Sequence, residues 1–440
     1  MLKKYNIGLL NGIVCSTKGK RKTSIGIKNN KIIKIGKINE DECIKVVNCK
    51  GLHILPGLID TQVHFREPGL SHKEDIFSGT ISALLGGITT VFEMPNTSPA
   101  TINKVELDKK LKIAKKTSWV NYSFFIGACK ENLTKLAKLE KLKGCAGIKI
   151  FMGSSTGNLL LSEEKDLELA LKTCKRRVAI HSEDEVRLRG RFLKVDKKKG
   201  VSQHEVWRDK QSAIISTKRV LKYAKKYNSK AHILHISTKD EIALLKKSKR
   251  NITAEITPQH LTLNSPSCYK ILGTRSQMNP PIRNKDHQKG LWQGIHDGII
   301  KVVGSDHAPH TIKEKNLKWP NSPSGLPGVQ TTLHLMLHHV NKGKISLEKV
   351  VELLAYNPAK IYGIKNKGQI KDGYDADITI IDLNKDYKIK NKDMAYKCKW
   401  TPFDGMNVKG DIYATLINGE IKMLNKKIIG KPSGKTVLFN

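Results

Sequence analysis

One stretch of the chain decides the fold: residues 52–69, LHILPGLIDTQVHFREPG. Its first half is apolar, and residues 54–59 are predicted to form a buried strand. Just beyond them, Gln62 and His64 alternate with Val63, so on an extended backbone their side chains point to the same side. A parallel barrel presents ligands to a metal ion in this way, at the end of a strand. The more usual pair at this spacing is His-x-His, and Gln62 departs from it.

An alternation of strands and helices continues from this stretch to about residue 306. Seven further apolar strands are predicted at residues 89–93, 123–126, 147–151, 178–181, 232–236, 253–257 and 301–304. Helical patterns lie between several of them, for example at residues 74–85, 104–115, 163–174 and 209–226. Eight strands that alternate with helices predict an α/β fold, a (β/α)8 TIM-type barrel, over residues 51–365.

The two ends of the chain show a different pattern. Residues 1–50 and 366–440 are rich in strand alternation interrupted by Asn, Gly and Lys turns. Neither segment alone is long enough for a good core, so we expect both to pair into one small β-sandwich domain beside the barrel. Pro, Ser and Gly cluster at residues 320–328, which predicts an ordered loop near the barrel mouth.

Charge and composition narrow the possible partners. The formal net charge is +39, but only 12 of the 79 basic residues are arginine, and the lysines are spread over nearly every segment. Nucleic-acid readers favour arginine forks and concentrated patches, so the charge indicates solvated helix faces and no nucleic-acid partner. A positive field would still concentrate small anionic substrates.

Compartment and assembly are predicted from other features. The eight cysteines are scattered without a Cys-x-x-Cys pair, which favours a reduced, cytoplasmic protein without disulfides. No apolar run is long enough to span a membrane, and the N-terminus lacks the features of a signal peptide. The sequence leaves open whether the protein forms a homo-oligomer.

Polar residues recur where the predicted barrel strands end. Besides Gln62 and His64, they are Asn96, Lys149, His181, His235 and Asp306. Each has a simpler explanation on its own: a lone histidine is often structural, Lys149 could snorkel to solvent, and Asp306 could cap a following helix. Their joint occurrence at the strand ends of one barrel predicts a metal site.

Five motifs in order resemble the amidohydrolase superfamily, and within it the cyclic-amide hydrolases, most closely the dihydroorotases. They are HFREPG at residues 64–69, EMPNT at 93–97, GIKIFMG at 147–153, NPPIR at 279–283 and GSDHAPH at 304–310. The resemblance covers nearly the whole chain. It implies a zinc-dependent, reversible hydrolysis of (S)-dihydroorotate to N-carbamoyl-L-aspartate in pyrimidine biosynthesis. An allantoinase- or hydantoinase-type amidase is the alternative.

The resemblance also implies a set of metal ligands. His64, Asp306 and the residue at Gln62 would hold one zinc ion, and His181 and His235 another, with a carbamylated lysine at 149 as the bridge. An amide oxygen is a weaker zinc ligand than an imidazole nitrogen, so we expect one tight zinc ion. A second ion with an imperfect shell is left open, as is a non-catalytic homologue.

The predicted substrate contacts lie beside these ligands. Arg66 is two residues beyond His64, and its planar fork suits a carboxylate such as that of dihydroorotate. A surface salt bridge to a neighbouring glutamate, Glu67 or Glu74, is the alternative for Arg66. The resemblance adds Asn96, Asn279 and His310 as substrate-binding residues. It also makes Asp306 the catalytic residue that moves a proton from water to the ring nitrogen, and His307 is expected to be structural.

Overall fold

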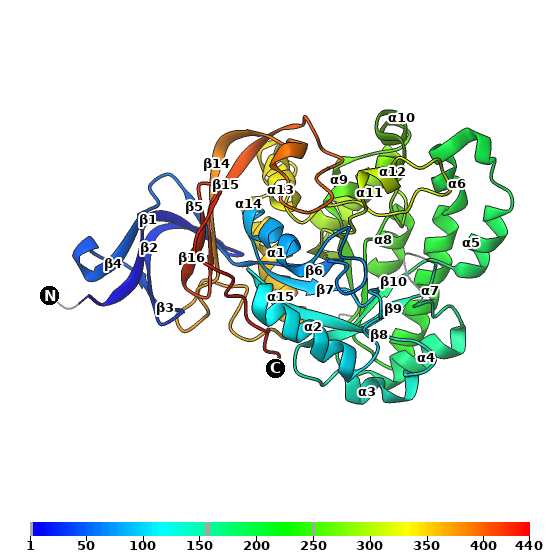
Figure 1. The fold of residues 1–440 in the computed structure, drawn as a ribbon, viewed down its shortest axis with the longest axis horizontal. Helices are drawn as coiled ribbons and strands as arrows, with labels where there is room; N and C mark the ends of the chain where they lie inside the picture. Colours follow the sequence, from blue (N-terminus) through cyan, green and yellow to red (C-terminus); the bar gives the residue numbers. More distant parts are fainter. Residues whose placement is uncertain (1–2, 155–158, 249–250) are drawn as a thin grey trace.

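Eight parallel strands form a barrel at the centre of the protein (Figure 1). The computed structural model describes residues 3–154, 159–248 and 251–440. Neighbouring barrel strands in the sequence are hydrogen-bonded to each other in order from first to last. The strands are β6 (Leu58–Val63), β7 (Ile88–Glu93), β8 (Asn121–Gly127), β9 (Cys145–Phe151), β10 (Val178–His181), β11 (Ala231–Ile233), β12 (Thr253–Ile256) and β13 (Ile300–Val303). The predicted strand count and barrel are confirmed.

The barrel closes between its last and first strands through residues that follow β13. The backbone N–H of His64 donates to the carbonyl of His307 at 2.7 Å, and Val63 and His307 form a parallel bridge. The backbone N–H of Ser305 donates to the Asp60 carboxylate at 3.1 Å. These contacts bring residues 60–64 beside residues 305–307, at the end of the barrel where parallel strands present functional groups.

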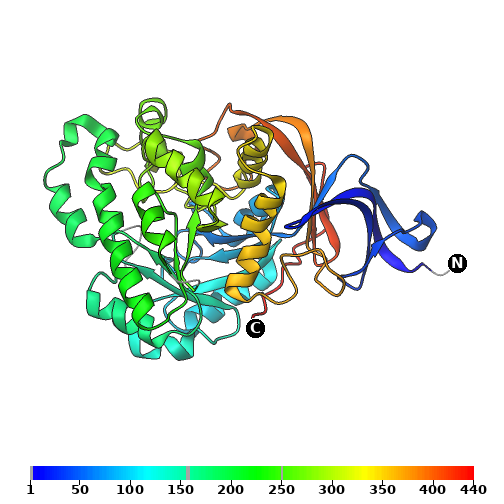
Figure 2. The same ribbon diagram turned by 180° about the vertical axis from the view of Figure 1, so that it is seen from behind.

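Helices cover the outside of the barrel (Figures 1 and 2). The four helices predicted at residues 74–85, 104–115, 163–174 and 209–226 are confirmed to within two residues. Three of them begin at side chains that cap the first free N–H groups, namely Asp75, Asn103 and Asp209. The helices are α1 (Ile76–Leu85), α2 (Lys104–Thr117), α3 (Leu136–Leu139), α4 (Glu164–Thr173), α5 (Glu185–Phe192), α6 (His204–Trp207), α7 (Lys210–Lys226), α8 (Lys239–Lys246), α9 (Pro258–Thr262), α10 (Ser267–Leu272), α11 (Lys285–His296), α12 (Ile312–Lys315), α13 (Thr332–Asn341), α14 (Leu347–Val351) and α15 (Asn357–Tyr362).

The terminal segments form a small β-domain, as predicted. Its strands are bonded into a single nine-stranded sheet with the order β17-β16-β15-β14-β5-β1-β2-β3, and β4 pairs with β1. The strands are β1 (Tyr5–Ser16), β2 (Gly19–Lys28), β3 (Lys31–Gly36), β4 (Cys43–Asn48), β5 (His53–Pro56), β14 (Ile378–Lys388), β15 (Asn407–Ile417), β16 (Glu420–Leu424) and β17 (Lys427–Ile428). Isoleucine and leucine side chains from both ends of the chain share its core.

The prediction of one barrel strand at residues 54–59 is wrong. The chain divides at Gly57: β5 before it pairs with β1 and β14 in the small β-domain, while β6 after it enters the barrel. A Cβ at position 57 would lie 2.5 Å from Thr89 Oγ1 and 2.6 Å from Asp377 Cβ. Only glycine permits this close approach, at which the Gly57 N–H donates to the Asp377 carbonyl at 2.7 Å.

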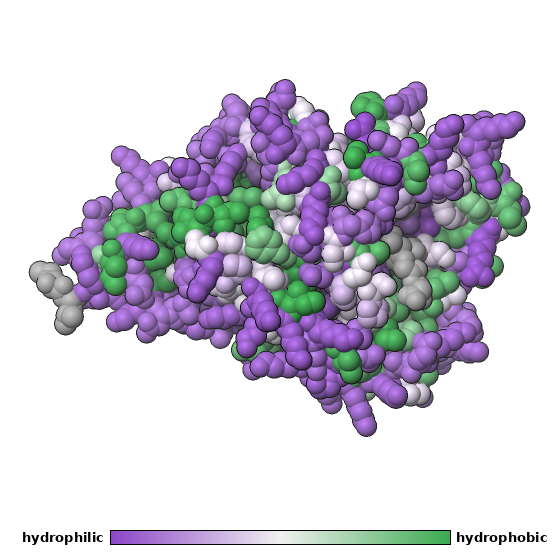
Figure 3. Space-filling view, viewed as in Figure 1, coloured by the Kyte–Doolittle hydropathy of each residue, from purple (hydrophilic) through white to green (hydrophobic). Residues whose placement is uncertain are grey.

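The surface that faces the viewer in Figure 3 is mostly hydrophilic. Figure 3 shows hydrophilic side chains over most of one face and a hydrophobic band over the small β-domain. None of the helices in the described part of the chain combines the length and apolar character needed to cross a membrane. All eight cysteines lie in described segments, and each is a buried free thiol.

Candidate active site

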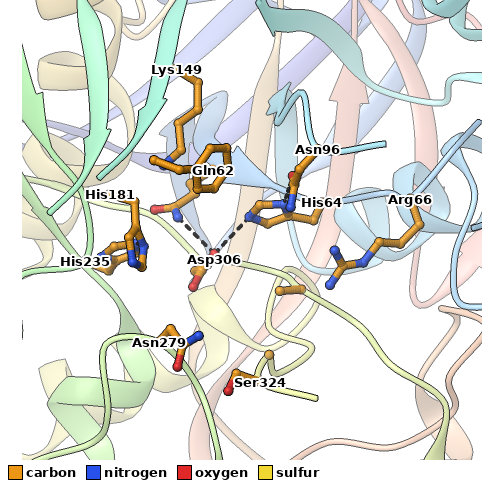
Figure 4. A pocket seen from close by; sticks show the side chains of 13 residues that line it. Gln62, His64, Arg66, Asn96, Lys149, His181, His235, Asn279, Asp306 and Ser324 are labelled. Carbon is orange, nitrogen blue, oxygen red and sulfur yellow. Dashed lines mark hydrogen bonds and ion pairs between the residues drawn. The ribbon is translucent and has the colours of Figure 1, made fainter. Parts of the chain in front are cut away.

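A pocket opens where the barrel strands end, and it gathers nine of the ten predicted site residues (Figure 4). Its lining consists of Gln62, His64, Arg66, Asn96, Lys149, Phe151, His181, His235, Asn279, Asp306, Ala308, Ser324 and Gly325. His310 is the predicted residue outside this lining. The polar side chains come from the ends of β6, β9 and β10 and from the connections that follow β7, β11, β12 and β13.

His181 and His235 form one half of the site. His181 Nδ1 lies 3.1 Å from His235 Nε2, so these two nitrogens are within hydrogen-bond distance of each other. Burial lowers the pKa of both histidines, which leaves the imidazoles neutral and able to offer lone pairs. Glu183 Oε2 lies 3.0 Å from the other nitrogen of His181, and Arg208 holds Glu183 at 2.5 Å. A carboxylate behind a histidine in this way fixes the orientation of the ring.

Lys149 lies on β9 between these two histidines and the rest of the site. Its side chain is 1% exposed and its Nζ is 4.5 Å from the centre of the Phe151 ring, so the snorkelling alternative is wrong. Burial lowers the pKa of Lys149 to about 7, although Asp306 and Glu255 oppose the shift. Much of this lysine is therefore a neutral amine at neutral pH, the form that reacts with carbon dioxide.

His64, Gln62 and Asp306 form the other half of the site. Asp306 Oδ1 lies 3.2 Å from His64 Nε2 and accepts a hydrogen bond from Gln62 Nε2 at 2.9 Å. The second ring nitrogen of His64 is 2.7 Å from the side-chain oxygen of Asn96. Gln62 Oε1 is buried and has no hydrogen-bond partner within the described segments. The cap alternative for Asp306 is wrong, because Thr311 caps α12.

The side chains of the site can hold a metal ion only if Gln62 or Lys149 supplies one of the ligand atoms. Within residues 3–154, 159–248 and 251–440, no three His, Cys, Asp or Glu side chains are grouped to hold an ion. His181 with His235, and His64 with Asp306, each supply two conventional donors. A third donor in each half has to come from a carbamylated Lys149 or from the unpartnered oxygen of Gln62.

Arg66 extends into the cavity from the opposite side (Figure 4). It is 1% exposed and its Nε donates to the Pro309 carbonyl at 3.2 Å, so the alternative of a surface salt bridge is wrong. Burial lowers the pKa of Arg66 to about 10, which still leaves the guanidinium charged. Its NH1 has no hydrogen-bond partner in the described part of the chain. A buried, incompletely bonded guanidinium beside a cavity is suited to an anionic ligand.

The remaining predicted residues occupy different positions. Asn279 lines the cavity, and its side-chain oxygen is 3.0 Å from His204 Nε2. The ring of His310 is fully buried beside Arg66 NH2, at 3.3 Å, and its Nε2 is 3.1 Å from the Ser324 carbonyl. His307 is also fully buried, and its Nδ1 accepts from the backbone N–H of Gly328 at 3.0 Å, in agreement with a structural role.

The sequence did not single out four of the lining residues, Phe151, Ala308, Ser324 and Gly325. The last two come from the loop at residues 320–328, whose composition predicted an ordered loop at the mouth but not which residues face inward.

Three residues of the site have strained backbone conformations. Arg66, His235 and Asp306 have φ angles of 63°, 37° and 44°, a region that residues with a Cβ rarely adopt and that is enriched at functional sites.

Comparisons with known proteins agree with this geometry. A sequence model described as the amidohydrolase family matches residues 53–422. The chain is 36% identical to the dihydroorotase of Pyrococcus horikoshii, over 94% of this chain and 91% of that protein. It is 37% identical to the dihydroorotase of Methanosarcina acetivorans, with the same coverage of each chain.

Solved structures give a similar result for the fold. The L-hydantoinase (dihydropyrimidinase) from Arthrobacter aurescens superposes with a TM-score of 0.93 at 26% identity, covering 98% of this chain and 99% of that one. The dihydropyrimidinase from Brevibacillus agri has a TM-score of 0.88 at 25% identity, covering 97% and 96%. The relatives with higher sequence identity are thus dihydroorotases, and the structural neighbours are hydantoinases and dihydropyrimidinases.

Proposed function

We propose that this chain, which belongs to the amidohydrolase family, is a dihydroorotase. It hydrolyses the ring amide of dihydroorotate to N-carbamoyl-aspartate and closes the same ring in the reverse direction. Relatives that are 36% and 37% identical over 94% of the chain carry this name. Within a family of cyclic-amide hydrolases, the residue that meets the far end of the substrate decides among dihydroorotate, hydantoins and dihydropyrimidines.

Arg66 is the observation that carries the choice of substrate. Dihydroorotate has a ring carboxylate, whereas hydantoin and dihydrouracil do not. The NH1 group of the buried guanidinium has no partner among the described residues, so a neutral ligand would leave it without a counter-charge, which costs several kcal/mol. A carboxylate completes it with charge-assisted hydrogen bonds. Asn96 and Asn279 are the neutral lining residues that supply further polar contacts.

Zinc is the metal that we assign to the site. His181, His235 and a carbamylated Lys149 would hold one ion tightly, while His64, Asp306 and the amide of Gln62 would hold a second ion weakly or not at all. When bound, zinc would supply hydroxide at neutral pH by lowering the pKa of water, and it would polarise the amide carbonyl. Asp306 is the proton carrier: it accepts the proton of the attacking water and delivers it to the departing ring nitrogen.

The cysteines and the net charge support a compartment and a class of partner for the enzyme. Eight free, buried thiols suit a reduced compartment, so we assign the protein to the cytoplasm. Its partner is a small anionic substrate, which the net charge of +39 would attract. A role as a non-catalytic homologue would have left no need for Lys149, His181, His235 and Asp306 to converge on one cavity.

A substrate comparison tests the proposal. The purified, zinc-loaded protein is incubated with dihydroorotate, hydantoin and dihydrouracil, and ring opening is followed by ultraviolet absorbance. We expect turnover of dihydroorotate to exceed that of the two neutral rings by at least about 100-fold, the value of one buried charge pair. Faster turnover of a neutral ring would identify a hydantoinase-type enzyme. No turnover of any of the three would identify a non-catalytic homologue.

A further inference from the structure

A second buried basic side chain, Lys73, lies behind His310 and Arg66. It belongs to the loop between β6 and α1 and is 9% exposed. Its Nζ is 3.1 Å from His310 Nδ1 and 2.8 Å from Glu314 Oε1. Glu314 is itself fixed, because its other oxygen accepts the backbone N–H of Thr311 at the start of α12 at 2.9 Å. Lys73 is therefore held against the histidine by a rigid partner.

The contacts of His310 determine which ring nitrogen carries the proton. A lysine ammonium can only donate, so His310 Nδ1 accepts from Lys73. A neutral imidazole with an accepting Nδ1 has its hydrogen on Nε2, and this hydrogen is donated to the Ser324 carbonyl at 3.1 Å. Burial, with Arg66 and Lys73 nearby, lowers the pKa of His310 well below its ordinary value, so the ring is neutral. Trp400 holds the backbone of the same residue by donating to its carbonyl at 2.8 Å.

This tautomer has a consequence for Arg66. Arg66 NH2 lies 3.3 Å from His310 Nε2, but two N–H groups cannot form a hydrogen bond with each other. Arg66 Nε is already bonded to the Pro309 carbonyl, and NH1 has no partner among the described residues. Both terminal nitrogens of the guanidinium therefore remain available on the side of the cavity.

We propose that Lys73 is a positioning residue that fixes the Nε2–H tautomer of His310 and thereby reserves the Arg66 fork for the carboxylate of the substrate. The inference rests on the proposed function, because dihydroorotate supplies that carboxylate. Without a donor at position 73, His310 can carry its proton on Nδ1 and accept from Arg66 through Nε2. The guanidinium then gains an internal partner and loses one of its two contacts to the substrate.

Steady-state kinetics of the zinc-loaded protein give the first test. Lys73→Met should raise the KM for dihydroorotate about tenfold, the value of one charge-assisted hydrogen bond, and leave kcat within about twofold. Lys109→Met is the matched control, because it removes the same charge from an exposed lysine paired with Glu106. Lys73→Gln removes the charge but retains an N–H donor, so its KM should lie closer to that of the unaltered protein. A normal KM in Lys73→Met overturns the proposal, and so do equal rises in the Met and Gln variants.

The tautomer itself is a readout that does not depend on activity. With 15N-labelled histidine, NMR distinguishes Nε2–H from Nδ1–H rings, and the signal of His310 is assigned by its loss in His310→Gln. We expect the Nε2–H form in the unaltered protein and the Nδ1–H form in Lys73→Met. The same tautomer in both proteins overturns the proposal, even if KM rises. An unaltered protein that does not turn over dihydroorotate would refute the proposed function instead, and the NMR comparison would still decide the role of Lys73.

Discussion

At position 62 an amide occupies a place where an imidazole would be the better zinc ligand. The structure adds what the sequence could not show. Gln62 Nε2 donates to Asp306, while its oxygen is buried without a partner in the described part of the chain. The residue thus orients the proposed proton carrier and still has one weak donor to offer a metal. A histidine at 62 would exchange that hydrogen bond for a stronger metal contact.

The role of Arg66 gives a prediction at the residue scale. Arg66→Ala should lower kcat/KM for dihydroorotate, because a charge-assisted pair with the substrate is lost. The decrease should correspond to a loss of about 2–4 kcal/mol of transition-state stabilisation. Bound zinc, measured by elemental analysis, should be unchanged. Arg21→Ala, at an exposed arginine, is the control. Unchanged kinetics in Arg66→Ala would remove the main argument for a carboxylate-bearing substrate.

The proposed role of Lys149 as a carbamylated metal ligand gives a second prediction about a single residue. Lys149→Ala should lose zinc and activity together, since the proposed tight site depends on a carbamate at this position. A short carboxylic acid added with zinc should restore part of the activity, because it replaces the missing carboxylate. Mass spectrometry does not decide the matter, because the carbamate is lost in acid. Experimental density for an unmodified ammonium in the zinc-loaded protein would contradict the assignment.

Residues that we propose as ligands were easier to single out from the sequence than the residues that contact them. His64, His181, His235 and Asp306 could be found because each follows a recognisable strand. Lys73 and Ser324 could not, because their partner His310 is 237 and 14 residues away in the sequence, and the direction of a loop side chain has no periodic signal.

Among the elements, the number of barrel strands was predicted more accurately than the point at which the first of them begins. Apolar runs predicted the right number of barrel strands, but the apolar run at residues 54–59 is divided between two sheets. Only the close approach of Gly57 to Asp377 separates β5 from β6, and that contact joins positions 320 residues apart. Hydrophobic periodicity is a local signal and carries no information about such a partner.

The packing of α13 on β15 gives a prediction about how two elements are held together. Asp411 on β15 lies 3.1 Å from His334 Nε2 on α13. Burial disfavours the charged carboxylate, but the hydrogen bond and attraction of His334, with Lys426 and Lys385 nearby, outweigh it and hold the pKa of Asp411 well below its ordinary value. A lowered folded-state pKa stabilises the fold above the unfolded value of about 4 and ceases to do so as the pH falls through the folded value.

Asp411→Asn should therefore lower the free energy of unfolding at pH 7 by about 1–2 kcal/mol. The difference from the unaltered protein should shrink as the pH is lowered below about 4. Urea unfolding at a series of pH values measures both. Asp372→Asn, at an exposed carboxylate, is the control. A difference that stays constant from pH 7 to pH 3 would show that the charge of Asp411 does not stabilise this contact.

At the scale of the whole molecule, the small β-domain meets the barrel at the beginnings of its strands. Asn121, the first residue of β8, donates to Asp377 at 3.0 Å and accepts from Asn418 at 3.0 Å. The cavity lies at the other ends of the strands. One segment between β14 and β15 nevertheless reaches the site, since Trp400 bonds the backbone of His310. Composition predicted a β-domain from both termini, but the position of this segment depends on tertiary packing.

The proposed enzyme has two unequal metal positions, a tight one at His181 and His235 and a weak one at Gln62, His64 and Asp306. Zinc is removed with a chelator and titrated back, and bound zinc and turnover of dihydroorotate are measured at each step. One zinc ion should bind tightly, turnover should rise with it, and both should be lost in His181→Ala and His235→Ala. A second ion should bind weakly or not at all, and Gln62→His should strengthen it. Two equally tight ions in the unaltered protein, a tight ion lost in His64→Ala but kept in His181→Ala, or no turnover at full loading would contradict the account.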